Sequence, residues 1–424
     1  MSVPALQSVR GWCPGALRPM ESGDGLIVRL RPRCGALSVA VVSEIAALAE
    51  SHGNGHIDLT RRANVQLRGV SEERLSSLWQ RLSELGLLDA SADAEAVRNV
   101  MVSPLSGIDP SDVADVRPLA VALETALGAE RDLWRLPAKF GFAVDGGGML
   151  PLDGIRADVW LKAARNDDVM GILVGVDRPE GIDWLGSTTL DAAAAVAVRI
   201  ARAFLDSRPD ARARMRDLSQ SAHDAVRLAV APHLDGMVSA SHVHFPERFL
   251  GQISCDDRPV AVGMAAPFGR VEASALAALA SAARDLGALE FRLSPWRAFY
   301  APAQDANDAA ELSLAAAANG FIVDAGDPLL AIEACPGAPG CRSAALDTRA
   351  AARHLAPMVA RLGARSCHVS GCAKGCACSQ AADLVLVGTA ERFGVLRSAT
   401  AQDEPRLFVS PDRLSDLPQL LKTV

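Results

Sequence analysis

The sequence lacks the features that would place it among membrane, secreted or nucleic-acid-binding proteins. No segment approaches the roughly 18 uncharged apolar residues that a membrane-spanning helix needs; the most apolar one, 190–205, is interrupted by Arg199 and Arg202 and predicts an amphipathic helix. The N-terminal segment has no apolar core of the kind that a signal peptide carries. The net charge of −7 argues against nucleic acid. We therefore expect a cytoplasmic protein without membrane or nucleic-acid partners.

The cysteines are unevenly distributed. There are nine among 424 residues, and six of them fall between Cys335 and Cys378. A disulfide framework would spread its cysteines along a short secreted chain, so this crowding in a long chain indicates an intracellular metal site. Cys367 and Cys378 flank one pair of the crowded cysteines, and we expect them to be bystanders.

Four of these cysteines form two pairs at ligand spacing. The motif Cys335-Pro-Gly-Ala-Pro-Gly-Cys341 is followed by Cys372-Ala-Lys-Gly-Cys376, which is C-x5-C and then C-x3-C. A [4Fe–4S] cluster needs four converging thiolates, and loops rich in glycine expose backbone N–H groups to the cluster sulfurs. Structural zinc is the alternative, although it usually takes cysteine pairs at closer spacing.

Two halves of the chain share one layout. In the first half a strand at 24–31 precedes a helix at 39–51, a strand at 55–59 and a polar loop at 60–66. In the second half a strand at 260–264 precedes a helix at about 273–286, a strand at 288–293 and a loop at 294–297. Downstream, 98–104 would match 331–336, and 136–140 would match 367–371. A duplicated α+β protein is the simplest interpretation, and coincidence between two ordinary α/β patterns is the alternative.

The cysteine motif resembles that of the nitrite and sulfite reductases that carry sirohaem and a [4Fe–4S] cluster. Thr60-Arg-Arg62 with Gln66 is similar to the family's T-x-R-Q-x-x-Q loop, and Arg98 and Lys139 match two further basic positions. The resemblance implies an α+β fold with a duplicated nitrite/sulfite reductase-like architecture: two ferredoxin-like half-domains and two larger α/β domains, the second with the cluster. The expected units are 1–85, 92–208, a linker at 209–245, 246–310, and the cluster domain at 325–424.

Two departures distinguish the chain from the reductases. Ala63 stands where the family loop has Gln, and Gly141 stands where the reductases carry a second Lys. Losing a cation weakens the prediction of an oxyanion reductase, because sulfite reduction needs positive charge around a small anion. Within the superfamily, the segments 10–16, 23–32 and 370–376 resemble the precorrin-3B synthases of aerobic cobalamin biosynthesis.

That resemblance implies a monooxygenase. Enzymes of this branch use O2 to hydroxylate precorrin-3A at C20 and form a γ-lactone, with a [4Fe–4S] cluster held here by Cys335, Cys341, Cys372 and Cys376 and a mononuclear non-haem iron. The only glycine run, 145–148, lacks the G-x-G-x-x-G spacing of a dinucleotide site. Electrons from NADH would therefore arrive through a separate reductase. Sirohaem belongs only to the alternative function, a sulfite or nitrite reductase.

Basic residues are the candidates for binding this polycarboxylate substrate, because Arg pairs with carboxylate in a bidentate way. Arg62, Arg98 and Lys139 are assigned to it on the motif match, and Arg29 and Arg31 are further candidates for which a solvated strand face is the alternative. His242 and His244, with Glu247 after them, have the composition of a two-His-one-carboxylate iron site. Two linker histidines are the alternative.

Overall fold

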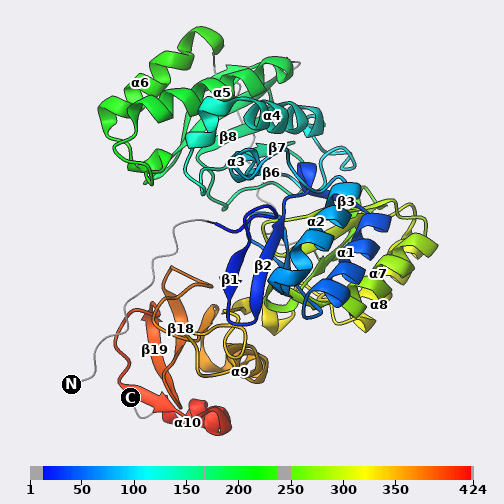
Figure 1. The fold of residues 1–424 in the computed structure, drawn as a ribbon, viewed down its shortest axis with the longest axis vertical. Coiled ribbons are helices and arrows are strands. Elements are labelled where there is room, and N and C mark those ends of the chain that lie inside the picture. The colour runs from blue at the N-terminus through cyan, green and yellow to red at the C-terminus, as the bar shows by residue number, and fades with distance from the viewer. Residues whose placement is uncertain (1–12, 167–168, 237–249, 422–424) are drawn as a thin grey trace.

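The computed structural model describes residues 13–166, 169–236 and 250–421. Three bodies are visible in Figure 1: a central one with helices α1, α2, α7 and α8, an α/β domain with α4, α5 and α6 on one side of it, and a second α/β domain with α9 and α10 on the other. Among the described residues, no helix is both long enough and apolar enough to cross a membrane.

The central body contains two five-stranded sheets that exchange an edge strand. Strand β13 of the second half pairs with β4 of the first half, and β3 of the first half pairs with β14 of the second. The first sheet has the order β1 (Met20–Ser22), β2 (Gly25–Leu30), β5 (Val65–Val70), β4 (His56–Leu59), β13 (Arg270–Glu272). The second has the order β11 (Gly251–Cys255), β12 (Arg258–Ala265), β15 (Ala298–Pro302), β14 (Glu290–Leu293), β3 (Ala36–Ser38).

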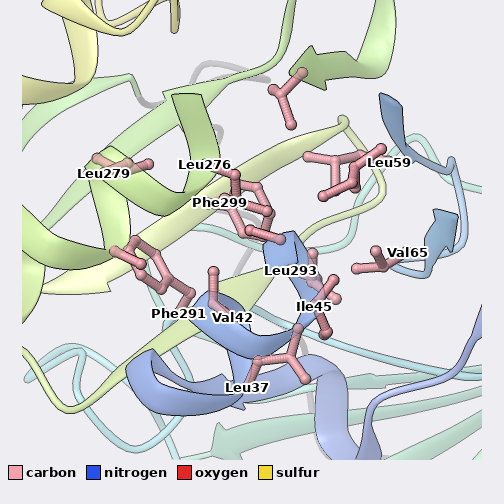
Figure 2. Close-up of a cluster of buried hydrophobic side chains, with 14 of the residues drawn as sticks. Leu37, Val42, Ile45, Leu59, Val65, Leu276, Leu279, Phe291, Leu293 and Phe299 are labelled. Carbon is pink, nitrogen blue, oxygen red and sulfur yellow. The ribbon is translucent and has the colours of Figure 1, made fainter. Parts of the chain in front are cut away.

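The two half-domains share one hydrophobic core. Helix α1 (Val39–His52) packs against α7 (Ala273–Asp285), its counterpart in the other half, and the buried side chains between them and the sheets form a single cluster. Figure 2 shows Val42 and Ile45 of one half beside Leu276 and Phe299 of the other. Helices α2 (Leu75–Glu84) and α8 (Ala306–Ala318) complete the layer. The expected duplication is therefore confirmed, and the halves are parts of one folded unit.

The two α/β domains have the same strand arrangement. In each, three parallel strands are followed by two antiparallel ones. The first sheet comprises β6 (Val100–Val102), β7 (Phe142–Asp145), β8 (Val159–Asn166), β9 (Val169–Arg178) and β10 (Gly181–Thr188). The second comprises β16 (Ile332–Ala334), β17 (Cys367–Ser370), β18 (Ala382–Gly388), β19 (Phe393–Ala399) and β20 (Leu407–Val409). The helices are α3 (Ala92–Val97), α4 (Arg117–Ala129) and α5 (Leu190–Ser207) in the first domain, and α9 (Thr348–Leu355) and α10 (Leu417–Leu420) in the second.

This topology corrects one expected correspondence between the halves. Because β17 occupies the position of β7 in its sheet, the segment 367–371 corresponds to 142–146 and not to 136–140. The other match holds, since β6 and β16 both begin their sheets. Between the two cysteine pairs, α9 is followed by two 3-10 turns that end at Leu362.

The expected linker is folded as far as the structure describes it. Residues up to 236 pack onto the first α/β domain and include helix α6 (Gln220–Val230), whose N-cap Ser219 accepts a hydrogen bond from the backbone N–H of Ala222. Val226 and Val230, four residues apart on one helix face, are fully buried in that domain's core. Two apolar anchors on an 11-residue helix are a weak periodic signal, which is why the segment resembled a linker in the sequence.

A buried ion cluster joins the central body to the cluster domain. Asp58 on β4 accepts two hydrogen bonds from Arg270 on β13 (2.6 and 3.0 Å) and lies 3.7 Å from both Arg68 and Arg349 of α9. Burial alone would raise the pKa of Asp58, but the hydrogen bonds and charge of Arg270, with the other two arginines, lower it to about 2. One carboxylate thus connects both repeats and α9.

Candidate functional site

The four cysteines of the spaced pairs lie in two loops at one edge of the second α/β sheet. Cys335 directly follows β16 and Cys372 follows β17; because these strands are adjacent and parallel, the loops after them meet at the same edge. The backbone N–H of Gly371 donates to Cys335 Sγ over 3.1 Å. Burial, and then the charges of Cys372, Cys335 and Cys341, raise the pKa of Cys376. The fold therefore gathers all four thiols.

The four thiols differ in their exposure. Cys335 is buried, Cys341 and Cys372 are half-buried, and Cys376 is exposed on the wall of a cavity. The two bystanders have different environments. Cys367 lies in the domain's hydrophobic core, where burial raises the pKa of its thiol to about 12, and Cys378 donates to the carbonyl of Gln380. His368, in the same strand, is completely buried, and burial lowers its pKa.

The cavity beside Cys376 has a volume of about 1150 Å3. This exceeds the ~300–1,000 Å3 typical of small-ligand pockets, so it has room for a macrocycle. Residues from the central body and both α/β domains meet around it. Its lining comprises Arg61, Arg62, Met101, Lys139, Asp153, Gly154, Ile155, Arg156, Pro179, Arg214, Arg216, Pro295, Trp296, Arg297, Glu333, Cys376, Ser379 and Gln380.

Positive charge dominates this lining. Seven of the lining side chains are Arg or Lys, whereas only Asp153 and Glu333 are acidic, in a chain whose net charge is −7. Asp153 is paired with Lys162 over 3.1 Å. A concave surface that concentrates one sign of charge attracts ligands of the opposite sign. The cavity is therefore built for an anion large enough to touch several walls.

One wall comes from equivalent loops of the two repeats. The β4–β5 loop carries Arg61 and the β14–β15 loop carries Arg297; both bind Glu333 of β16, each over 2.7 Å. The loops share a backbone feature as well, since Ala63 and Arg297 have positive φ values of 52° and 60°. Glu333 precedes Cys335 by two residues, so it ties both repeats to the cysteine loop.

A second wall carries three arginines that are anchored from behind by buried aspartates. Arg214 binds Asp158, which is fully buried, through Nε (2.9 Å to Oδ1) and through Nη2. Arg156 and Arg216 both pair with Asp177, over 3.3 and 3.7 Å. None of these three arginines was expected at the site from the sequence. Arg214 and Arg216 belong to an Arg-rich stretch within the segment 209–245, whose weak periodicity predicts a linker.

Of the basic residues assigned to the substrate from the sequence, the cavity contains Arg62 and Lys139. Arg62 Nη2 donates to the backbone carbonyl of Lys139 over 2.8 Å. Burial is the main cause that lowers the pKa of Arg62, and the charge of Arg214 adds to it. A cation that is both desolvated and beside another cation favours an anionic neighbour.

The other assigned arginines do not line this cavity. Arg98 is buried and bound to Asp89 over 2.8 and 3.0 Å, and it also donates to the carbonyl of Arg31. Arg31 is buried and donates to the carbonyl of Glu95 (2.7 Å) and to Asn99 Oδ1 (2.9 Å). These internal partners give both residues a structural role between the central body and the first α/β domain.

Arg29 has a buried Nε without a hydrogen-bond partner, and burial, followed by the charge of Arg31, lowers its pKa to about 10. It is not a solvated strand residue, and it does not line the cavity. His242, His244 and Glu247 lie outside the described residues.

Comparison with known proteins places this geometry in a family. The model of the nitrite/sulfite reductase ferredoxin-like half domain matches residues 18–85, and that of the nitrite and sulphite reductase 4Fe-4S domain matches 93–221. The second match covers the first α/β domain, and the matched residues include no cysteine. A Precorrin-3B synthase from Sinorhizobium sp is 31% identical over 94% of this chain and 85% of its own length. The chain belongs to the precorrin-3B synthase family.

Two more distant relatives place this family within the nitrite/sulfite reductase superfamily. A ferredoxin–nitrite reductase from Synechococcus elongatus is 31% identical over 38% of this chain and 32% of its own length. The solved structure of the Mycobacterium tuberculosis NirA protein superimposes with a TM-score of 0.74 at 21% identity, covering 94% of this chain and 80% of that one. This likeness confirms the fold. A member of the precorrin-3B synthase family is accordingly an oxidoreductase with an iron–sulfur domain.

Proposed function

We propose that the protein is an O2-dependent monooxygenase that hydroxylates precorrin-3A at C20 and forms the γ-lactone in aerobic cobalamin biosynthesis. The observation that carries this proposal is the cavity: it is large, basic, shared by both repeats, and bordered by Cys376. A tetrapyrrole with several carboxylate side chains has the size and charge that this lining favours. The similarity to the Sinorhizobium Precorrin-3B synthase along nearly the whole chain supports the same function.

The cysteine quartet fits a [4Fe–4S] cluster. Gly371 donates its N–H to Cys335 Sγ, as backbone amides do around cluster sulfurs, and the charges of the other three thiols contribute to the raised pKa of Cys376. Within the described ranges no three His, Cys, Asp or Glu side chains are gathered closely enough for a single metal ion. The C-x5-C spacing of the first pair is wider than structural zinc usually takes, which favours a cluster. When bound, the cluster would pass single electrons to the cavity.

The protein's own residues would bind and orient the macrocycle. Arg62 and Lys139, with Arg61 and Arg297 held by Glu333, lie where substrate carboxylates could pair with them. The hydroxylation places one oxygen atom of O2 on C20 and reduces the other to water. The electrons required would come from NADH through a separate reductase. The described residues supply no ligand set for a mononuclear iron, so we route no step through one.

A labelling experiment tests the reaction. Anaerobically purified protein would be given precorrin-3A, a chemically reduced ferredoxin and 18O2, and the product analysed by mass spectrometry. We expect a product that carries one 18O atom on the macrocycle. Unlabelled product, or none from protein with an intact cluster, would contradict the proposal.

A visible spectrum with extraction of bound tetrapyrrole separates this function from the alternative. Sirohaem bands, together with reduction of sulfite or nitrite by an artificial donor, would identify a reductase. Gly141, where the reductases carry a Lys, favours the monooxygenase. We expect a cluster absorption without sirohaem.

A further inference from the structure

Gly141 has no side chain, although the space beside it could hold one. A Cβ built on Gly141 would lie 3.6 Å from Arg62 Nη1 and 3.5 Å from the carbonyl of Asn99, which are ordinary contact distances. Gly141 is therefore not required by crowding. Its backbone N–H donates to Asp158 Oδ2 over 2.8 Å, and its carbonyl accepts from the N–H of Asp158 over 2.8 Å.

Arg214 approaches the same place from a distant part of the sequence. The carboxylate of Asp158 that binds Gly141 also binds Arg214 Nε and Nη2, and it accepts the backbone N–H of Met215 over 3.0 Å. Two anchored nitrogens hold the guanidinium in one orientation.

The charges around this point favour an anion. Arg214 and Arg62 both line the cavity, and the charge of Arg214 is the largest electrostatic influence on Arg62. Asp158 binds Arg214, and its negative charge partly offsets the effect of Arg214 on the pKa of Arg62. Bringing two guanidinium groups together in a partly desolvated wall is unfavourable until a negative group lies between them.

We propose that Arg214, positioned by Asp158, is a substrate-binding residue that replaces from the outer wall the cation that Gly141 does not provide, and that it selects a polycarboxylate macrocycle over a small oxyanion. This inference rests on the proposed function. A Lys at position 141 would concentrate charge beside Arg62, as a small anion needs. Arg214, on the cavity wall, leaves the space beside Gly141 open, and its planar guanidinium group can pair with a carboxylate.

The test is a binding titration with uroporphyrin III, a stable polycarboxylate tetrapyrrole. Binding is monitored by the quenching of tryptophan fluorescence, since Trp296 lines the cavity. Arg214→Gln should weaken binding about tenfold, the loss expected for one charge-assisted contact. The matched control is Arg227→Gln, because Arg227 Nη2 donates to both carboxylate oxygens of Asp183 (2.8 and 2.9 Å) in the same domain but Arg227 lies outside this cavity. Arg227→Gln should leave the affinity unchanged.

A rescue variant sharpens the test. Since position 141 has room for a side chain, Gly141→Lys added to Arg214→Gln should recover about threefold of the lost affinity. Coproporphyrin, with fewer carboxylates, should show a smaller effect of Arg214→Gln. If Arg214→Gln fails to fold, as seen by circular dichroism, Arg214→Lys decides, and an unchanged affinity in that variant would overturn the inference.

Two negative results have different meanings. If the wild-type protein and Arg214→Gln bind uroporphyrin III with equal affinity, Arg214 is not part of the site, and the proposed function still stands. Wild-type protein that binds neither porphyrin would overturn the proposed function and this inference together.

Discussion

The two α/β domains have the same topology, but the loops at the same edge of the two sheets differ in their residues and contacts. In the second domain the loops after β16 and β17 carry the cysteine pairs. In the first domain the corresponding loops, after β6 and β7, bind each other directly: Asp109 Oδ2 accepts the N–H of Met149 over 2.6 Å, and the carbonyl of Gly146 accepts the N–H of Val113 over 2.9 Å. A Cβ on Gly148 would lie 2.2 Å from Asp112 and 2.3 Å from Asp109.

This difference shows that the scaffold does not depend on the cluster. Hydrogen bonds between tightly packed loops are enough to hold the edge of the first sheet, and the glycine run 146–148 is needed because the loops approach so closely. In the second domain the thiols occupy the equivalent loops, so that edge would be held by metal–sulfur bonds. The glycine run is thus the structural counterpart of the second cysteine pair.

Replacing a cysteine should produce the largest effect. Cys341→Ser removes one of four thiolates, and we expect loss of the cluster absorption and of nearly all iron and acid-labile sulfide, because a hydroxyl is a poor cluster ligand. Cys255→Ser, in β11 and away from the quartet, is the control and should keep full iron content. An intact [4Fe–4S] signal in Cys341→Ser would refute the ligand assignment.

Removing the iron should loosen one domain and spare the other. After chelation, amide hydrogen exchange in loops 335–347 and 371–381 should quicken by about tenfold or more, because the bonds that hold them are lost. Exchange in loops 103–116 and 146–158 should not change, since hydrogen bonds hold them. Equal acceleration in both pairs of loops would contradict the comparison.

The arginines that join each domain to the central body should differ in importance. Arg98 is 4% exposed and bound to Asp89, and breaking a buried pair of this kind costs about 3–5 kcal/mol. Arg349 of the cluster domain lies 3.7 Å from Asp58, has two nitrogens without partners, and has a pKa that burial lowers to about 10. Thermal unfolding should show a large decrease in Tm for Arg98→Met and a much smaller one for Arg349→Met. The reverse order would be inconsistent with these contacts.

The smallest effect concerns the acidic loop of the first domain. Burial raises the pKa of Asp112 to about 7, and the charges of Asp109 and Asp145 contribute to the increase. The folded state therefore keeps a proton that the unfolded state releases near its ordinary pKa, so stability should fall as pH rises from about 4 to 7 and then level off. Asp112→Asn should raise Tm at pH 8 by about 2 °C. Little gain is expected at pH 3, where Asp112 is mostly protonated in both states, and a gain of the same size there would exclude titration as the cause.

The repeats could be predicted from the sequence because their signals are local. The helices at 39–51 and 273–286 were expected within a residue of α1 and α7, since apolar periodicity and flanking strands lie within short windows. The exchanged edge strands β3 and β13 could not be found in this way. Each has three residues, and its pairing is with the other half of the chain.

The basic residues of the site show the same division. Motif matching selected Arg62 and Lys139, which line the cavity. It also selected Arg98, whose guanidinium is instead bound to Asp89. Arg214 was missed because its anchor, Asp158, is 56 residues away in the sequence. Spacing alone reports which charges exist, not which of them are already neutralised by partners inside the fold.

The sequence by itself determined the spacing of the cysteine pairs, the duplication and the family, because each depends on residue identity at short separation. Only the tertiary structure decided which arginines face the cavity, how the two halves share one core, and where Cys376 meets the cavity wall. These features depend on contacts between segments that are far apart in the chain. In such contacts, burial and pairing decide whether a charge supports the fold or remains available to a ligand.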